Sequence, residues 1–317
     1  MTVIIIMNEF GIKKIYIAGS HGFCAGVERA VDILYKVLKK HKPPIYSRHA
    51  IVHNRRVISD FEKKGVVFVE NIKDIPDKSV VVFSAHGSPS YFYEIAKKKK
   101  FILYDAMCPL VLKVHIEAKR YAKEDFFIIY IGHKNHPEAE GVLGDVPKKS
   151  IMLIDEYQDI DELNIPKNKK IAVLTQTTLS FDDTKKIINK LKLKFSNLVF
   201  PPTFDICFAT QNRQNSVKNL VKKVKTIIVI GSSTSSNSSR LKEIAEKQGA
   251  KAYLIDDVTL IKSYWFKDIS EIGITAGASA PKNLIDEVIA YLKSKDTEVV
   301  CLQDFKENIH FSRPKNL

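Results

Sequence analysis

The segment Phe126-Phe127-Ile128-Ile129-Tyr130-Ile131 runs directly into Gly132-His133 and then into His136-Pro137-Glu138. A short apolar run that ends at a glycine predicts a strand buried on both faces. The polar residues after it precede a segment of helical period, so the stretch predicts a strand, a loop and a helix in that order. A strand of this kind is typical of a parallel sheet that helices cover on both sides.

The same pattern recurs along the whole chain. Short runs rich in β-branched residues alternate with amphipathic segments, which indicates βαβ units. These runs are too many for one small mononucleotide-binding sheet, so the sequence predicts an α/β protein built from several small layers. The predicted strands are residues 15–18, 66–69, 80–84, 101–104, 126–131, 151–154, 171–174, 226–230, 252–255, 272–275 and 298–302.

Length and composition exclude several classes of protein. The chain has 317 residues, of which 45% are hydrophobic and 27% charged, so it is neither disordered nor fibrous, and two or three domains are expected. No apolar run approaches the roughly 20 residues that span a bilayer. The formal net charge of +14 attracts nucleic acid, an anionic substrate or an acidic protein, and charge alone does not choose between them.

Four cysteines, Cys24, Cys108, Cys207 and Cys301, lie far apart and form no C-x-x-C pair. Zinc ribbons and bacterial-ferredoxin clusters take their ligands from local pairs, so this spacing excludes both. A secreted disulfide scaffold is smaller and denser in cysteine. A reducing compartment is therefore expected.

Three of these cysteines share a local setting. Cys24, Cys108 and Cys207 each precede a segment of helical period, and they are separated by about the length of a small α/β unit. Helix N-termini stabilise thiolates. A structural zinc ion normally has four ligands, whereas a cluster held by three cysteines keeps one iron open to a substrate. Cys301 lies in an apolar run instead and is expected to be a buried small hydrophobic residue.

Five predicted strands end in small, hydroxyl or imidazole residues just before a helix. In open α/β sheets, ligands bind at this end of the strands, beside helix N-termini. A diphosphate bonded by imidazoles and hydroxyls fits His53, His86 and His136 together with the loop at residues 231–238. Glu138 is placed to supply protons. The alternative is that the Ser, Thr and Asn residues only cap the helices that follow.

Seven motifs follow one another along nearly the whole chain. They are His21-Gly22-Phe23-Cys24-Ala25-Gly26-Val27, Asp105-Ala106-Met107-Cys108-Pro109-Leu110, Gly132-His133 with His136-Pro137-Glu138 and Glu140-Gly141, Thr175-Gln176-Thr177-Thr178-Leu179-Ser180, Asp205-Ile206-Cys207, Gly231-Ser232 with Ser235-Ser236-Asn237-Ser238, and Thr275-Ala276-Gly277-Ala278-Ser279-Ala280-Pro281. In this order they resemble the motifs of the LytB/IspH family of iron–sulfur reductases.

The resemblance implies a fold and a domain plan. It implies a trefoil of three small α/β domains with mostly parallel sheets around a central iron–sulfur cluster. By the cysteine spacing, the domains are expected at residues 25–108, 109–203 and 204–292. A strand at residues 14–24 is expected to join the third domain, and residues 293–317 to form a C-terminal tail.

The resemblance also implies a role for each matching residue. Cys24, Cys108 and Cys207 match the three ligands of a 4Fe–4S cluster whose fourth iron is open to the substrate. Glu138 matches the proton donor, Thr177 matches the hydroxyl that orients the substrate and relays protons, and His136 is expected to act with them. The positions that match the substrate and diphosphate pocket are His53, His86, His136, Thr177, Ser235, Ser236, Asn237 and Ser279.

The implied reaction is the reductive dehydroxylation of 4-hydroxy-3-methylbut-2-enyl diphosphate to isopentenyl and dimethylallyl diphosphate. This is the last step of the methylerythritol phosphate route to isoprenoids. Because no flavin or nicotinamide fingerprint is visible, an outside electron donor, ferredoxin or flavodoxin, is expected. A monomer or weak dimer is expected, without nucleic acid or membrane. The Lys- and Ile-rich composition slightly favours a plastid-type organelle such as an apicoplast over the bacterial cytoplasm.

Two other classes of protein stay open at this point. A basic nucleic-acid-binding protein predicts cations interleaved with exposed aromatic residues along one stripe, whereas the lysines here are scattered. A zinc hydrolase would use His133, His136 and Glu138. That class favours tightly spaced ligands such as H-E-x-x-H, and it leaves the three cysteines unexplained.

Overall fold

Parallel strands covered by helices make up the fold in the computed structural model, which describes residues 10–155, 158–165, 169–303, 305, 307, 309–314 and 317. The chain divides into two compact units. The first unit consists of Met1–Cys24, His53–Val57 and Phe208–Ile309. The second consists of Ala25–Val52, Ile58–Cys207 and His310–Leu317. The predicted α/β class with parallel sheets is confirmed.

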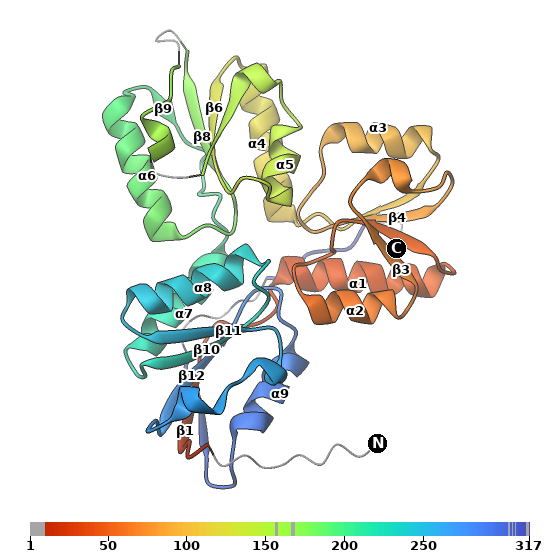
Figure 1. The fold of residues 1–317 in the computed structure, drawn as a ribbon. Helices are drawn as coiled ribbons and strands as arrows, with labels where there is room; N and C mark the ends of the chain where they lie inside the picture. The colour runs from red at the N-terminus through yellow and green to blue at the C-terminus, as the bar shows by residue number, and fades with distance from the viewer. Residues whose placement is uncertain are drawn as a thin grey trace. The chain divides into compact units, whose positions relative to one another are not determined.

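The first unit contains a parallel sheet with the strand order β11-β10-β12-β1-β13. Its strand β1 comes from the N-terminal end of the described chain, whereas its neighbours come from beyond residue 225, so distant segments build one sheet (Figure 1). The bounds are β1 (Lys14–Ile17), β10 (Thr226–Ile230), β11 (Lys251–Ile255), β12 (Glu271–Ala276) and β13 (Glu298–Cys301).

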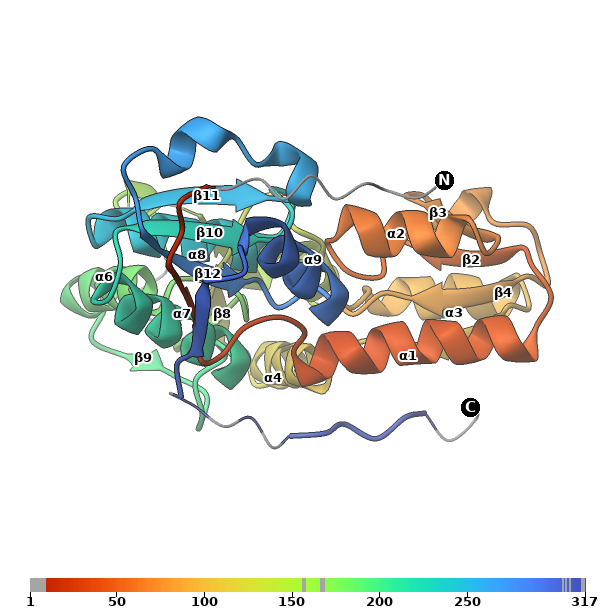
Figure 2. The same ribbon diagram turned by 90° about the horizontal axis from the view of Figure 1, so that it is seen from below.

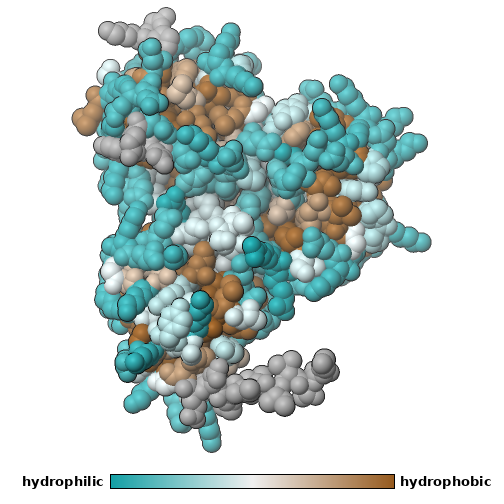
Figure 3. All heavy atoms as spheres, viewed as in Figure 1, coloured by the Kyte–Doolittle hydropathy of each residue, from teal (hydrophilic) through white to brown (hydrophobic). Residues whose placement is uncertain are grey.

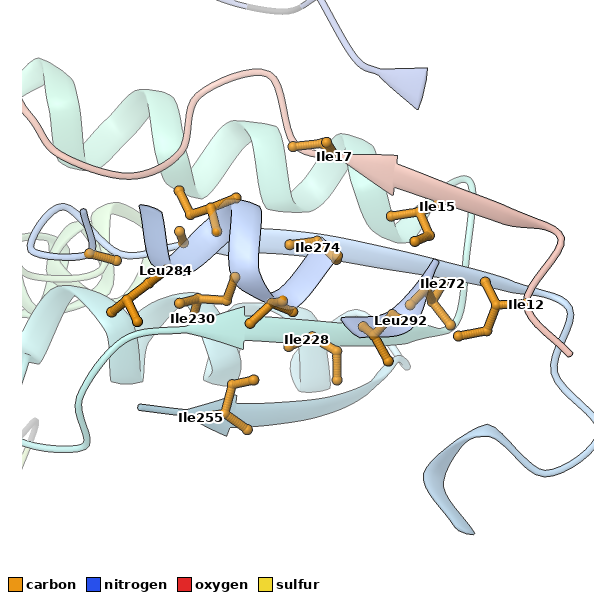
Figure 4. Packing of buried hydrophobic residues seen from close by; sticks show 14 of the residues in the cluster. Ile12, Ile15, Ile17, Ile228, Ile230, Ile255, Ile272, Ile274, Leu284 and Leu292 are labelled. Carbon is orange, nitrogen blue, oxygen red and sulfur yellow. The ribbon is translucent and has the colours of Figure 1, made fainter. Parts of the chain in front are cut away.

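Helices cover both faces of this sheet because its central strands are apolar at most positions. Ile228 and Ile230 pack against α9 (Lys282–Leu292) in one cluster, shown in Figure 4. Ile227 and Val229 point the other way, to α7 (Phe208–Val221) and α8 (Ser236–Lys247). Figure 2 shows the strands side by side with these helices around them. Successive side chains of a strand alternate between faces, so the continuous apolar run builds two cores.

The second unit contains two further parallel sheets. The first has the order β3-β2-β4-β5, with α1 on one side and α3 on the other (Figure 1). Phe92 and Ala96 of α3 pack on Val81 and Phe83 of β4. The bounds are α1 (Ala25–Lys40), β2 (Ile45–Arg48), α2 (Arg55–Glu62), β3 (Val66–Val69), β4 (Val80–Phe83), α3 (Ser90–Lys98) and β5 (Ile102–Asp105).

The other sheet of this unit has the order β7-β6-β8-β9. Ile129 and Ile131 of β6 pack with residues of α6, whereas Ile128 and Tyr130 pack with α4 and α5. The segment that predicted a doubly covered strand therefore forms one. The bounds are α4 (Pro109–Lys123), β6 (Phe127–Ile131), α5 (Pro137–Leu143), β7 (Ile151–Ile154), β8 (Ile171–Thr175), α6 (Phe181–Lys194) and β9 (Leu198–Val199).

The remaining features of the described chain are its surface and five short 3-10 helices. On the face seen in Figure 3, hydrophilic side chains cover most of the surface, with hydrophobic patches between them. No helix among the described residues is both long and apolar enough to cross a membrane. The 3-10 helices are η1 (Ile72–Asp74), η2 (Lys148–Ser150), η3 (Gln158–Ile160), η4 (Val258–Leu260) and η5 (Ser263–Phe266).

The predicted strands are all present, within a residue or two at their ends. The prediction missed β2 and β9. Cys301 corrects another expectation, because it is exposed rather than buried. It lies in β13, an edge strand that pairs only with β1 among the described residues, so one side of the strand has no covering neighbour. The boundaries at residues 25–108, 109–203 and 204–292 stay a prediction.

Candidate active site

Cys24 lies where β1 gives way to a loop, in the first unit. Its N–H donates to Ala278 O at 3.2 Å, and the N–H of Gly22 donates to Ala276 O at 3.1 Å. These bonds fix the loop against the end of β12. The side chain of Cys24 is half-buried and forms no disulfide. The loop therefore presents a thiol at the carboxyl end of the sheet.

Cys108 and Cys207 occupy comparable places in the second unit. Cys108 is the N-cap of α4, and its N–H donates to Ala85 O at 3.0 Å. Cys207 directly precedes α7, and its N–H donates to Thr177 O at 3.1 Å. Both side chains are half-buried and outside any disulfide. The predicted position of the three cysteines, each just before a helix, is confirmed.

The donor chemistry of these cysteines fits an iron–sulfur cluster. Three half-buried thiols directly precede helices, and cysteine thiolates are the protein ligands of such clusters. Within the described ranges, no three His, Cys, Asp or Glu side chains are assembled as a metal site. Cys24 belongs to one unit and Cys108 and Cys207 to the other, so their joint ligation of one cluster is a proposal.

Glu138 and Thr177 form a buried pair in the second unit. Glu138 lies in the first turn of α5, and only 1% of its surface is exposed. One carboxyl oxygen accepts from the Thr177 N–H at 2.8 Å, and the other accepts from the Thr177 hydroxyl at 2.9 Å. Thr177 follows β8, so the end of β8 and the start of α5 are joined through this carboxyl group.

The surroundings of Glu138 favour its protonated form up to a pH near neutral. Burial raises the pKa of Glu138 from its ordinary 4.5 to about 7, against the two hydrogen bonds from Thr177, which lower it. The negative charge of Asp205 adds to the increase. A carboxyl group with this pKa can hold a proton and release it at physiological pH. The raised pKa is the property that a buried proton donor needs, whereas the role of Glu138 as that donor stays a prediction.

Two imidazoles of the second unit lie close together. The rings of His86 and His136 are 5.9 Å apart, edge to face. His136 is the N-cap of α5, and its Nδ1 accepts from the Glu138 N–H at 3.2 Å. Because Nδ1 is an acceptor, the neutral ring carries its proton on Nε2. His86 follows β4, where its Nδ1 lies 3.4 Å from the Ser84 hydroxyl.

The remaining expected site residues gather in the first unit, around the start of α8. The Ser279 hydroxyl donates to His53 O at 2.9 Å and to the Ser235 hydroxyl at 3.3 Å. Asn237 Oδ1 accepts from the Ala278 N–H at 2.8 Å. Ser236, half-buried, is the first residue of α8. The structure thus brings His53, Ser235, Ser236, Asn237 and Ser279 together in one place.

This cluster has the features of an anion site. Ser235 caps α8 by accepting from the Ser238 N–H, so the helix-capping alternative is correct for this hydroxyl. Capping does not explain Asn237, whose Nδ2 is buried without a hydrogen-bond partner among the described atoms. A Cβ on Gly277 would lie only 2.0 Å from Ser238 Oγ, so the backbone there approaches α8 very closely. An orphaned donor beside a helix N-terminus fits a bound anion.

Sequence patterns gave no sign of two buried groups that support these loops. Arg213 of α7 is 1% exposed and donates to Gly22 O and Phe23 O, at 2.7 and 3.1 Å from Nη2. It also forms an ion pair with Glu307 at 3.0 Å. The other group is His115 of α4, paired with Asp145. His115 lies within an amphipathic segment and Arg213 within a largely polar one, and in neither does a single polar residue carry a signal of its burial.

The zinc hydrolase alternative is not supported by the geometry of its three residues. His133 Nδ1 lies 2.8 Å from Asp155 Oδ1, whereas the Glu138 carboxyl group is bonded to Thr177 through both oxygens. A zinc site would need the two histidines and Glu138 directed to one point. The pairings of His133 and Glu138 direct them to different partners.

Comparisons with known proteins give one consistent result. The family described as LytB protein matches residues 15–293. A protein of Vesicomyosocius okutanii named 4-hydroxy-3-methylbut-2-enyl diphosphate reductase is 48% identical over 96% of this chain and 99% of its own length. A protein of the same name from Acinetobacter baumannii is 45% identical over 96% of this chain and 98% of its own.

Solved structures agree with these relatives. The E-1-hydroxy-2-methyl-but-2-enyl-4-diphosphate reductase from Plasmodium falciparum is similar with a TM-score of 0.93 and 38% identity, over 96% of each chain. A second structure, titled (E)-4-hydroxy-3-methyl-but-2-enyl diphosphate reductase, the terminal enzyme of the non-mevalonate pathway, has a TM-score of 0.63 and 30% identity. It matches over 89% of this chain and 99% of its own.

Proposed function

The chain belongs to the LytB family, and from this premise we propose how its own residues carry out the family's reaction. The protein is an iron–sulfur oxidoreductase. It catalyses the reductive dehydroxylation of 4-hydroxy-3-methylbut-2-enyl diphosphate to isopentenyl and dimethylallyl diphosphate. Overall, the substrate takes up two electrons and two protons and loses its hydroxyl group as water. The last step of the non-mevalonate route is thereby completed.

Cys24, Cys108 and Cys207 are the ligands of the proposed 4Fe–4S cluster. Each is half-buried, lies outside any disulfide and directly precedes a helix. When bound, the cluster supplies electrons and an open iron that polarises the oxygen of the leaving hydroxyl group. Cys301 is no candidate ligand, because it lies on an edge strand away from any helix start.

The cluster of polar groups at the start of α8 holds the diphosphate. Asn237 Nδ2 offers a buried donor that the described protein atoms leave unpaired, and Ser236 and Ser279 supply hydroxyl groups near it. His53 belongs to the same unit as this cluster, and His86 and His136 of the second unit are proposed as further imidazole donors to the substrate. Binding a charged group far from the reacting carbon provides orientation, and binding energy realised only in the transition state raises the rate.

Glu138 delivers the proton. The observation that carries this proposal is a fully buried carboxyl group with a pKa of about 7, held in one orientation by both hydrogen-bonding groups of Thr177. Thr177 fixes the direction in which the carboxyl oxygens point. His136 Nδ1 accepts from the backbone of Glu138, so the imidazole and the carboxyl group keep a fixed relation.

The electron donor, the cellular location and the assembly of the protein are proposed from its charge and its relatives. An acidic protein such as ferredoxin or flavodoxin suits a chain with a net charge of +14. The preference for a plastid-type organelle finds no support in the curated relatives named above, which are bacterial. A single copy of the chain or a weak dimer remains the proposed assembly.

The decisive experiment compares the wild-type enzyme with Glu138→Gln, both reconstituted anaerobically with iron and sulfide. The wild type should bind close to four irons and convert the substrate to both products. Glu138→Gln should bind as much iron and substrate but lose about 100-fold or more in kcat. Glu94→Gln makes the same change at an exposed position of α3 and should retain turnover. Near-normal kcat in Glu138→Gln would overturn the proton-delivery role.

A further inference from the structure

A second ionisable cluster lies in the same unit as Glu138, and no step proposed above uses it. His115, on α4, is 1% exposed. Its Nδ1 lies 2.7 Å from Asp145 Oδ2, and Lys119, one turn further along α4, places Nζ 2.9 Å from the same oxygen. A buried imidazole bonded to a carboxylate has a fixed ring orientation.

Asp145 is the anchor of this cluster. Its other oxygen accepts from the N–H of Ser90, the first residue of α3, at 2.6 Å. Burial by itself raises the pKa of Asp145, but hydrogen bonds from His115, Lys119 and Ser90 outweigh it and lower the pKa to about 2. The carboxylate is therefore ionised at neutral pH, and it ties α4 to the start of α3.

The opposite edge of the His115 ring touches two glycines. A Cβ on Gly87 would lie 2.7 Å from Nε2, and a Cβ on Gly141 would lie 2.9 Å from Cε1. Real Cβ atoms do not approach other atoms this closely, so neither position accepts a side chain while the ring stays in place. The imidazole is thus packed tightly between the turn after β4 and helix α5, and this ring is called the wedge below.

These two glycines belong to the segments that carry the proposed substrate groups. His86 directly precedes Gly87, and α5 begins after His136 and carries Glu138 one turn before Gly141. The rings of His86 and His136 are in edge-to-face contact. The thickness and position of the His115 ring therefore set how far apart the two segments lie.

We propose that His115, held by Asp145, is a positioning residue that sets the spacing of His86 and His136 and thereby the affinity for the diphosphate substrate. The inference rests on the proposed function, since it takes those two imidazoles as substrate-binding groups. His115 itself contacts neither substrate nor cluster in this proposal. Its effect passes through Gly87 and Gly141.

The first test separates KM from kcat. His115→Ala removes the wedge, and His115→Phe keeps a ring but loses the bond to Asp145. Because misplacing a binding group by about 1 Å can cost up to about 100-fold, we expect KM to rise by about 10-fold or more in His115→Ala and less in His115→Phe. Kcat should change by less than KM. An unchanged KM in a folded His115→Ala enzyme would overturn the proposal.

His41→Phe is the matched control for the loss of a histidine hydrogen bond in the same unit. His41 Nε2 lies 2.8 Å from the Tyr104 hydroxyl and touches neither glycine segment. If loss of stability alone raised KM, His41→Phe should raise it to the same extent as His115→Phe at equal loss of melting temperature. An equal rise would count against the proposal, and an unchanged KM in His41→Phe supports it.

The second test uses Gly141→Ala, which needs no change at His115. Alanine is favoured over glycine in a helix by about 1 kcal/mol, so the substitution stabilises α5 unless its methyl group meets the ring. We expect Gly141→Ala to raise KM, and to add little further in a His115→Ala background, where the ring is gone. If the two substitutions raised KM additively, the contact between the methyl group and the His115 ring would not be the cause, and the proposal would be contradicted. If His115→Ala fails to fold, Gly141→Ala alone still tests the proposal, because an unchanged KM in this variant would contradict it.

Failure of the inference and failure of the proposed function give different results. If the wild-type enzyme does not convert the substrate, the proposed function is wrong, and the role of His115 that rests on it is wrong as well. If the wild type is active and KM is the same in every folded variant, only the role of His115 falls. Melting curves of each reconstituted protein show which variants are folded.

Discussion

At the scale of single residues, Glu138 combines a cost in stability with a use in catalysis. Folding raises its pKa from 4.5 to about 7, so the folded chain holds a proton that the unfolded chain releases between these values. The native state binds more protons than the unfolded state in this pH range. The free energy of unfolding therefore falls as pH rises from 4.5 to about 7, by about 3 kcal/mol in total. A residue kept at such a cost is a candidate for function.

The pH dependence of stability checks this account of Glu138. Glu138→Gln stays neutral at every pH, so it lacks the proton that the folded wild type keeps, and the unfolded wild type releases, between about pH 4.5 and 7. We expect the variant to gain in free energy of unfolding relative to the wild type as pH rises from 5 to 8. Urea denaturation of both proteins at the two pH values measures the difference. A constant difference would mean that burial does not raise this pKa.

Thr177 should tune the pH at which Glu138 loses its proton. Its two hydrogen bonds to the carboxyl group lower the pKa that burial raises. Thr177→Val removes the hydroxyl bond and keeps the backbone bond, so the pKa of Glu138 should rise and the alkaline limb of the kcat profile should move to higher pH. Thr177→Ser keeps a hydroxyl group and should restore the wild-type limb. Identical limbs in the Val and Ser variants would refute the coupling.

The chemistry-bearing residues of the site could be predicted from the sequence, whereas their supports could not. Glu138 and Asn237 lie just after the loops that follow predicted strands, at the end of a sheet where ligands bind. His115 lies inside an ordinary amphipathic helix, and Arg213 lies inside a helix whose sequence is largely polar. Their importance comes from tertiary contacts with carbonyl groups and glycines distant in the sequence, which no local pattern encodes.

At the scale of elements, apolar runs predicted the strands well because a doubly covered strand must be apolar at every position. Strand β2, Ile-Tyr-Ser-Arg at residues 45–48, escaped because its polar residues break the run. Ser47 and Arg48 are nevertheless buried, and Arg48 is paired with Glu140 at 2.6 Å. Strand β9 was not predicted because it has only two residues. Pairing between distant strands, such as β1 with β12, was not readable from local pattern.

Helix α7 should hold the Cys24 loop through Arg213. Arg213→Met leaves Gly22 O, Phe23 O and Glu307 without their donor, and breaking a buried ion pair costs about 3–5 kcal/mol. Arg213→Lys keeps the charge and loses the fork of donors, so its loss should be smaller. Chemical denaturation of the metal-free chain measures both.

A second readout makes this role specific to the loop. If Arg213 fixes the loop, the Cys24 thiol of the metal-free chain should react faster with an alkylating reagent in Arg213→Lys, whereas the Cys301 thiol should react at an unchanged rate. Peptide mass mapping separates the two sites. Arg120→Lys, which alters an exposed pair with Glu117, is the control and should change neither rate. Equal Cys24 rates in wild type and Arg213→Lys would leave the loop independent of Arg213.

At the scale of the whole molecule, the expected groups are divided between both units. The first unit carries Cys24 and the polar cluster at the start of α8, which resembles an anion site. The second carries Glu138 with Thr177 and the other two cysteines. Among the described residues, neither unit alone has both the features of an anion site and a buried proton donor.

The net charge of the whole chain leads to the last prediction. An excess of 14 positive charges attracts an acidic electron-transfer protein over distances that salt screens, with a screening length of about 10 Å at 0.1 M. The rate of reduction by an acidic ferredoxin should therefore fall by about tenfold or more when salt is raised from about 0.02 to about 0.5 M. With a small uncharged reductant the rate should change little, because steering acts only on a charged partner. Ferredoxin-dependent turnover that is insensitive to salt would show that the positive charge does not guide this encounter.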